Sequence, residues 1–230
     1  MKKIVTVTLN PAIDKTVFMG MPLDIGGLNR VQKVVLDIGG KGINVSKMIA
    51  VLGGKSVAVG FIGGAAGMQM LRGIASVDSS PSGDVLGYGG IAADFIEVAQ
   101  ETRTNLKVLS PEANGFTSIS KVTEINEPGG TIKPSEMLAL EKKLLDYADE
   151  HTIFVFAGSI PSGVDCGIYA KLIHMVKAKG AEVLLDADGA VFSAVLNAQV
   201  PPNTLALPDY IKPNKYELIQ YFQHANQSGE

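Results

Sequence analysis

Apolar, β-branched runs alternate along this chain with segments of helical periodicity, and this alternation is what most restricts the fold. Four runs have the composition of buried strands: 3–9 (KIVTVTL), 56–64 (SVAVGFIGG), 152–158 (TIFVFAG) and 182–189 (EVLLDADG). Apolar spacing predicts helices over 43–52, 134–149 and 165–180, and residues 209–214 lead into the helix-like run KYELIQYF. Strands that alternate with helices imply βαβ units. We therefore expect an α/β protein with a mostly parallel sheet between two helical layers.

Two stretches break this rhythm. Residues 94–109 and 118–126 alternate apolar and polar side chains with no helix between them, and 13–35 shows the same pattern in pieces. Such alternation predicts antiparallel strands with one face in water, so we expect a small β appendage that acts as a lid. The stretch 65–93 contains one helix-like segment (MQMLRGIA) and is otherwise rich in turn formers, which predicts an exposed loop.

The composition excludes several classes of protein. The 230 residues are 46% hydrophobic and carry a net charge of −3, without a basic face for nucleic acid. A single cysteine, Cys166, cannot form an internal disulfide and suits a reducing compartment. The N-terminal apolar run is short and broken by threonines, and no window approaches a membrane span. We expect a cytoplasmic protein with neither a nucleic-acid nor a membrane partner.

The run DIGGKGINVSK, residues 37–47, places three glycines around Lys41 at the start of a predicted helix. It is not a P-loop, because Gly42 stands where the hydroxyl residue belongs, and it is not a dinucleotide fingerprint, because it does not directly follow the first strand. Backbone N–H groups at a helix N-terminus can face a polar ligand, and Lys41 and Asn44 add polar groups. The alternative is a tight connection with a solvated lysine.

Polar residues on two predicted strands are further candidates. Asp14 follows the first strand, where ligands of open α/β sheets bind, although a turn or capping aspartate is the simpler interpretation. Arg103, Asn105 and Lys107 share one strand face and would suit a phosphate, or they form a solvated face.

Polar residues near the predicted C-terminal helix are also candidates. Asn214 and Glu217 at its start could hold a hydrated Mg²⁺, or they could simply cap it. Asp186 and Asp188 end a buried strand near the same edge, where they are either cleft residues or turn residues.

Together these stretches resemble the PfkB carbohydrate kinase family of ribokinase-like fold, in the branch that contains 1-phosphofructokinase and tagatose-6-phosphate kinase. The matches run from residue 3 to about residue 222 and include TVTLNPAIDKT (6–16), GGKGINVSKMIAVLGG (39–54), DFIEVAQETRTNLKV (94–108), TEINEPGG (123–130), FAGSIPSGV (156–164) and IKPNKYEL (211–218). The resemblance implies one kinase domain over 1–230, with a three-layer αβα core and lid segments at about 12–38 and 94–126.

The resemblance also implies a role for each matching position. Those that would bind the sugar are Asp14, Gly40, Lys41 and Asn44. Those that would lie near the substrate phosphate are Arg103, Arg30 and Lys107, and Ser159 would line the same substrate-binding cleft. Lys212 and Asn214 would lie near the phosphates of ATP, and Asn214 and Glu217 form an N-x-x-E element that is tied indirectly to Mg²⁺. The lid often makes a dimer contact in this family, so we expect a homodimer through the β lid if the fold is complete.

The implied reaction is ATP-dependent phosphorylation of a ketohexose phosphate. The runs TEINEPG and NPAID favour fructose 1-phosphate, which would become fructose 1,6-bisphosphate. Tagatose 6-phosphate and fructose 6-phosphate are the alternative substrates.

One family element is missing from these 230 residues. The family's Gly-Ala-Gly-Asp run supplies an anion hole and the general-base aspartate, and no such run occurs here. We therefore expect a chain truncated before its catalytic aspartate. Loss of both groups would lower the rate by several orders of magnitude, since each contributes about 10²-fold or more. A truncated, inactive sugar-phosphate-binding remnant is thus a further alternative. The stretches 65–93 and 197–208 are longer than the family pattern.

Overall fold

Seven strands form the larger of two sheets in the computed structural model, which describes residues 2–75, 89–112, 121–198 and 207–227. The strands lie in the order β11 (Tyr210–Ile211), β10 (Glu182–Asp186), β9 (Thr152–Ala157), β1 (Lys3–Thr8), β4 (Ser56–Ile62) and β5 (Ile91–Ala93), and β6 (Ile96–Glu97) also pairs with β4. Every pair in this sheet is parallel, which confirms the prediction of an α/β core.

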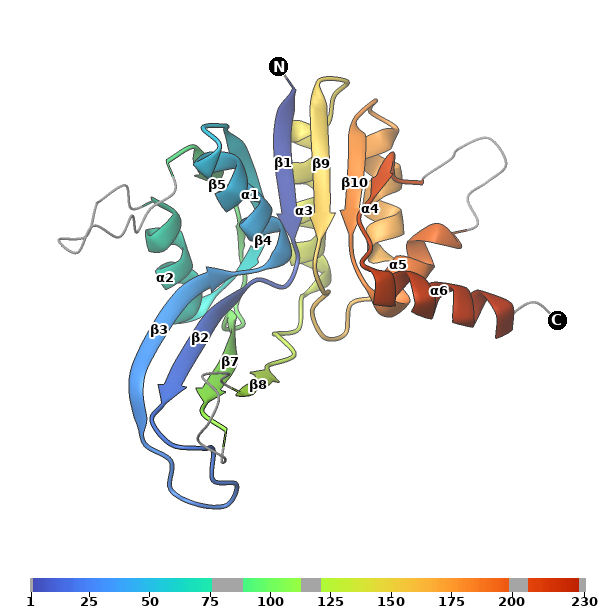
Figure 1. Cartoon of the computed structure of the whole chain (residues 1–230). Coiled ribbons are helices and arrows are strands. Elements are labelled where there is room, and N and C mark those ends of the chain that lie inside the picture. The colour runs from blue at the N-terminus through green and yellow to red at the C-terminus, as the bar shows by residue number, and fades with distance from the viewer. Residues whose placement is uncertain (1, 76–88, 113–120, 199–206, 228–230) are drawn as a thin grey trace.

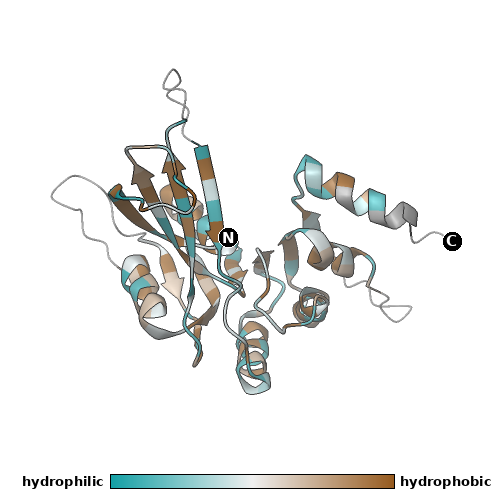
Figure 2. Cartoon of the chain, turned by 90° about the horizontal axis from the view of Figure 1, so that it is seen from below, coloured by the Kyte–Doolittle hydropathy of each residue, from teal (hydrophilic) through white to brown (hydrophobic). Residues whose placement is uncertain are grey.

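Helices cover both faces of this sheet, so the core has three layers (Figure 1). In front lies α1 (Lys41–Val51), and behind lie α3 (Pro134–Tyr147) and α4 (Ile168–Lys177). The remaining helices are α2 (Gly64–Ala75), α5 (Gly189–Leu196) and α6 (Lys215–Gln227). In two perpendicular views α6 lies at the margin of the molecule, next to the C-terminus (Figures 1 and 2). The sequence did not predict α5, and α2 begins earlier than the predicted segment MQMLRGIA.

Strand β1 shows how the layers are built. Its valines, Val5 and Val7, belong to the main hydrophobic cluster, which also contains the buried apolar residues of α3 and α4. Its threonines point to the opposite face, because successive strand residues alternate. There the hydroxyl of Thr6 lies 2.8 Å from the hydroxyl of Ser46 on α1. The alternation of threonine and valine thus sets a polar contact with α1 on one face of β1 and an apolar core on the other.

The second sheet is the predicted lid, and in Figure 1 it extends below the core. Its strands lie in the order β3 (Val31–Gly39), β2 (Ala12–Met19), β7 (Arg103–Ser110) and β8 (Lys121–Asn126). The β2–β3 and β7–β8 pairs are antiparallel, as expected, but β2 and β7 are parallel, so the prediction of a wholly antiparallel lid was wrong. Both strands leave the core at the same edge and therefore run in the same direction.

The predicted lid segment 94–126 also begins too early. Strand β6 lies inside this segment but pairs with β4 of the large sheet. Residues 113–120 of the segment lie outside the described part of the chain, as do 76–88 of the stretch 65–93 and 199–206 of the stretch 197–208. Among the described residues, no helix is long and apolar enough to cross a membrane.

Candidate functional site

A cleft of about 540 Å³ opens at the carboxyl ends of β10 and β11. It brings together residues of α1, of the segments that follow these two strands, and of α6. Its lining consists of Lys41, Asn44, Val45, Met48, Asp186, Asp188, Lys212, Asn214 and Glu217. All seven polar residues of this lining were candidates in the sequence, at positions up to 176 residues apart, between Lys41 and Glu217.

Lys41 lies at the centre of the charges in this cleft. Its Nζ is 3.5 Å from Asp186, 3.7 Å from Asp188 and 3.8 Å from Glu217. All three separations exceed normal hydrogen-bond length, so the ammonium group is shared among carboxylates rather than bound tightly to one. Lys212 donates to Asp186 at 3.1 Å. Two lysines therefore stand in the cleft in positions from which they can turn to an anionic ligand.

Asp186 belongs to the cleft. It is the last residue of β10, and its side chain is 11% exposed. The alternative interpretation of Asp186 as a turn residue is therefore wrong. Asp188 is the N-cap residue of α5 and is more exposed.

Asn214 and Glu217 form a reciprocal cap at the start of α6. Asn214 Oδ1 accepts the backbone N–H of Tyr216 and of Glu217, and Glu217 Oε2 accepts the N–H of Asn214. Glu217 Oε1 faces Lys41 instead. In the described part of the chain, no group of three or more His, Cys, Asp or Glu side chains could hold a metal. The indirect tie of this pair to Mg²⁺ therefore stays a prediction.

The glycine-rich loop owes its shape to close packing on Thr8. Gly40 has φ +124°, a conformation that side-chain-bearing residues rarely adopt. A Cβ on Gly42 would lie 2.5 Å from the hydroxyl oxygen of Thr8, which is buried and has no hydrogen-bond partner among the described residues. Both glycines allow the start of α1 to lie directly on the end of β1, and this contact places Lys41 and Asn44 at the cleft.

A second polar group joins the lid to the core. Asp14 lies against Gly39, where a Cβ would be 2.3 Å from its carboxylate, and it accepts a hydrogen bond from Asn105 at 2.9 Å. Arg103 donates to Asn105 and to the backbone oxygens of Asn10 and Glu127. Burial lowers the pKa of the Arg103 guanidinium, an effect that the negative charges of Asp14 and Glu127 oppose.

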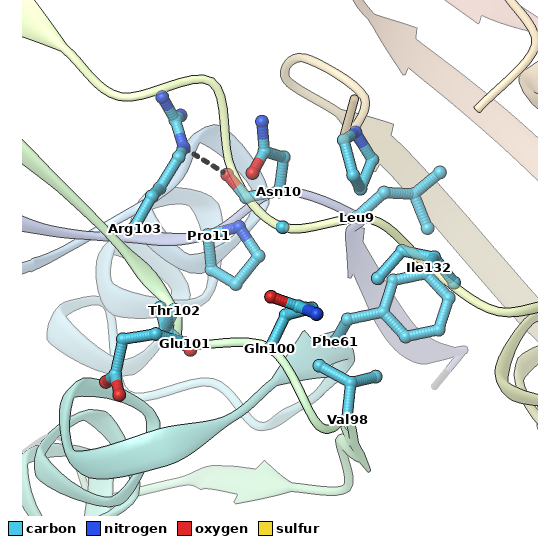
Figure 3. Close-up of a pocket in the computed structure, with 12 residues that line it drawn as sticks. Leu9, Asn10, Pro11, Phe61, Val98, Gln100, Glu101, Thr102, Arg103 and Ile132 are labelled. Carbon is cyan, nitrogen blue, oxygen red and sulfur yellow. Dashed lines mark hydrogen bonds between the residues drawn. The ribbon is translucent and has the colours of Figure 1, made fainter. Parts of the chain in front are cut away.

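Figure 3 shows Arg103 directed at the carbonyl of Asn10, beside a pocket of about 20 Å³. Leu9, Pro11, Phe61, Val98 and Ile132 provide most of its apolar wall. A volume of this size holds a water molecule at most. This pocket is therefore too small to hold a sugar phosphate.

Asn10 was not predicted as a site residue. Its amide donates to the backbone oxygens of Pro128 and Ile160 and lies 3.4 Å from the hydroxyl of Ser159. It therefore fixes the loop that carries Ser159 beside the lid junction. The signal for Asn10 was present in the sequence, because it follows the same strand that led to the selection of Asp14.

Two predicted residues lie apart from this group. Lys107 pairs with Glu124 across β7 and β8, at 3.1 Å, with both side chains about half exposed. Arg30 is exposed and precedes Val31, which pairs with Met19 at the far end of the β2–β3 hairpin from Asp14. The roles of these two residues stay predictions.

Comparisons with known proteins agree with the arrangement. The model of the pfkB family of carbohydrate kinases matches residues 7–230. A 1-phosphofructokinase of Xanthomonas campestris pv. campestris is 34% identical over 96% of this chain and 62% of its own length. A tagatose-6-phosphate kinase of Staphylococcus epidermidis is 30% identical over 96% of this chain and 63% of its own.

A solved structure supports the same match. Phosphofructokinase-2 from Escherichia coli, in complex with fructose-6-phosphate, superposes with a TM-score of 0.78 at 28% identity and covers 97% of this chain and 65% of its own. The chain therefore spans somewhat less than two thirds of the length of these relatives.

Proposed function

Because the chain belongs to the pfkB family of carbohydrate kinases, we propose that it forms the sugar-binding part and part of the nucleotide-binding cleft of an ATP-dependent ketohexose-phosphate kinase. The proposed reaction transfers the γ-phosphoryl group of ATP to the C6 hydroxyl of fructose 1-phosphate. The products are fructose 1,6-bisphosphate and ADP. The observation that carries this proposal is the convergence of Lys41, Lys212 and Asn214 in one cleft, beside a lid that carries Asp14.

The sugar would bind between the lid and the start of α1. The carboxylate of Asp14 can accept hydrogen bonds from two sugar hydroxyls, and Asn44 offers both a donor and an acceptor. The backbone N–H groups near Gly40 lie at a helix N-terminus, which favours a polar or anionic ligand. Arg103, Arg30 and Lys107 are the proposed ligands of the phosphate that the substrate already carries, and Ser159 would line the same cleft.

The nucleotide phosphates would bind at the other end of the cleft. Lys212 and Lys41 supply positive charge there, and Asn214 and Glu217 would hold Mg²⁺ through water. When bound, Mg²⁺ neutralises charge on the transferring phosphates, which is its usual contribution to phosphoryl transfer. Lys41 is proposed to act at both ends of the cleft. Its backbone belongs to the glycine-rich loop at the sugar end, and its ammonium group lies near Glu217 at the nucleotide end.

No described carboxylate of the cleft is proposed as the general base. Asp186 is paired with Lys212, and one oxygen of Glu217 is bound to the backbone of α6. The chain is therefore assigned binding and orientation of the two substrates, and turnover is a separate question for experiment.

The substrate is tested by comparing three sugar phosphates. We expect calorimetry to give a lower dissociation constant for fructose 1-phosphate than for tagatose 6-phosphate or fructose 6-phosphate. The relatives named tagatose-6-phosphate kinase and phosphofructokinase-2 support the other two as the alternatives. An ATP-coupled assay on the same samples measures turnover. Binding without turnover would support the remnant, and absence of binding for all three would overturn the proposal.

We also propose that the lid mediates a homodimer. Exposed apolar side chains lie on its outer strands: Val31, Val34, Val35 and Leu36 on β3, and Val122 and Ile125 on β8. Figure 2 looks at the chain from the side of the lid and shows brown residues along these strands. Exposed apolar side chains on an edge strand such as β3 indicate an interaction surface. Light scattering should report a dimer that Val34→Lys converts to a monomer, with the exposed residue Lys142→Ala as a control.

A further inference from the structure

Lys47 is a buried lysine that does not line the cleft. It lies on the inner face of α1, and its side chain is 10% exposed. Its Nζ donates to Asp37 Oδ1 at 2.7 Å and to the carbonyl oxygen of Ile38. An ammonium group is costly to bury and is retained only where it is paired and hydrogen-bonded. A hydrophobic residue would fill this position at less cost, so the ion pair calls for a role beyond packing.

The partner of Lys47 stands opposite a proposed sugar ligand. In the register of β2 and β3, Asp37 pairs with Asp14. Residues that are directly opposite in antiparallel strands point to the same face, and like charges in these positions repel. Lys47 compensates the charge of Asp37, and Asn105 donates to Asp14 from the other side. Each of the two carboxylates in this row of the lid therefore accepts a hydrogen bond from a side chain of its own.

The same ion pair also links α1 to the end of β3, two elements that are already neighbours in the chain. Strand β3 ends at Gly39, and only Gly40 separates it from α1. Lys47 lies almost two turns along α1 and reaches back to the last residues of β3. The lid strand beside Asp14 and the helix that bears Asn44 are thus joined twice, once by the backbone and once by this ion pair.

We propose that Lys47 is a positioning residue for sugar binding. Through Asp37 it sets the angle between the lid and α1, and with it the separation between Asp14 on the lid and Asn44 on the helix. This inference rests on the proposed function, since it assigns a purpose to the geometry of the sugar site. Loss of the ion pair disturbs the sugar end of the cleft and leaves Lys212 and Asn214 at the nucleotide end in place.

The test compares Lys47→Met with Lys47→Arg, Asp37→Asn and the double variant Lys47→Met/Asp37→Asn. The matched control is Lys171→Met, because Lys171 forms a similar ion pair with Glu141, between α4 and α3 on the far side of the sheet. Calorimetry measures the dissociation constants of fructose 1-phosphate and of Mg-ATP, and thermal melts measure the Tm of each variant.

We expect Lys47→Met to weaken fructose 1-phosphate binding about tenfold or more, with Mg-ATP binding changed less than about twofold. Lys47→Arg should restore most of the affinity, and the double variant should be less affected than the sum of its single changes. Lys171→Met should lower the Tm and leave both dissociation constants unchanged.

The outcomes separate the two proposals. If wild-type protein binds fructose 1-phosphate and folded Lys47→Met binds it equally well, the positioning role is overturned and the proposed function stands. Equal weakening of sugar and nucleotide binding also overturns it, because that pattern indicates general destabilisation. If the wild type binds none of the three sugar phosphates, both proposals fail. If Lys47→Met does not fold, the dissociation constants of Asp37→Asn and Lys47→Arg are compared instead. Weaker fructose 1-phosphate binding in Asp37→Asn alone supports the positioning role, and equal binding in both variants and wild type overturns it.

Discussion

Asn214 and Glu217 bind each other's backbone at the first turn of α6: Glu217 Oε2 accepts the Asn214 N–H at 2.7 Å, and Asn214 Oδ1 accepts the Glu217 N–H at 3.0 Å. Helix capping and a contribution to the cleft are therefore not alternatives here. The cap uses one carboxylate oxygen and turns the other towards Lys41. The start of α6 thus positions the negative charge of Glu217 in the cleft.

Glu217→Gln should separate these two roles. Glutamine keeps an oxygen for the cap, as in a capping box, so we expect the free energy of unfolding to change by less than about 0.5 kcal/mol. The lost charge would no longer attract the hydrated Mg²⁺ of the proposed site, so the dissociation constant of Mg-ATP should rise about tenfold. Asn214→Ala is the contrasting variant and should cost about 1 kcal/mol of stability through the lost cap. Urea titrations and calorimetry measure both effects, and a Glu217→Gln protein with unchanged Mg-ATP binding would contradict the assignment.

Gly42→Ala should destabilise the fold. The new Cβ would meet the Thr8 hydroxyl at 2.5 Å and the backbone oxygen of Val7 at 3.1 Å, so α1 must move away from β1. Overpacking of this kind typically costs about 1–3 kcal/mol. Gly89→Ala is the matched control, since a Cβ at Gly89 would have open space around it. Equal midpoints of urea unfolding for the two variants would show that the loop does not pack as described.

Arg103→Lys should weaken sugar-phosphate binding despite the conserved charge. The guanidinium joins Asn10, Asn105 and Glu127 at once, and an ammonium group on a flexible stem cannot reproduce that planar geometry. We expect the dissociation constant of fructose 1-phosphate to rise roughly tenfold in Arg103→Lys and further in Arg103→Met. Lys107→Met, on the same strand but paired with Glu124, should have a smaller effect. The reverse order in calorimetry would assign the phosphate to Lys107.

Asp209 should contribute to loss of stability in acid. Burial opposes its ionisation, but hydrogen bonds from Lys177 and from the backbone of Val183 outweigh burial and hold its pKa below the usual value. A lowered pKa in the folded state means that the ionised carboxylate stabilises the fold above its unfolded pKa of about 3.9. This stabilisation is lost as the pH falls through the folded pKa.

The measurement is a series of urea titrations from pH 7 to pH 2.5 on wild type and Asp209→Asn. We expect wild type to be more stable at pH 7 and the difference to shrink below about pH 4. Glu150→Gln serves as the control, because Glu150 is highly exposed. A stability difference that stayed constant over this range would rule out the ionised carboxylate as its source.

The core could be predicted because its information is local. Strands such as β1 and β9 are short β-branched runs, and α3 and α4 show a clear apolar stripe, so their type follows from spacing alone. Helix α5 was missed because GAVFSAVL is apolar almost throughout and has no polar face to define a period.

The lid and the cleft depend on contacts between distant segments. Alternation in β2 and β7 indicates strands but does not encode that the two pair in parallel. Likewise, the βαβ pattern predicted that polar residues gather at the carboxyl edge of the sheet, but it did not predict which of them lie next to Lys41. Asp186, Asp188 and Glu217 come from separate places in the chain and meet only when the sheet has formed.

The continuity of β3 and α1 has a mechanical consequence. Nine residues of strand span about 30 Å and end at a single glycine before the helix. Because the arm is long and its connection to α1 is short, a small rotation at Gly40 would produce a larger displacement at the tip of the hairpin. A fluorophore attached near Ile25, which is 92% exposed, would therefore magnify events at the loop into a readily measured signal.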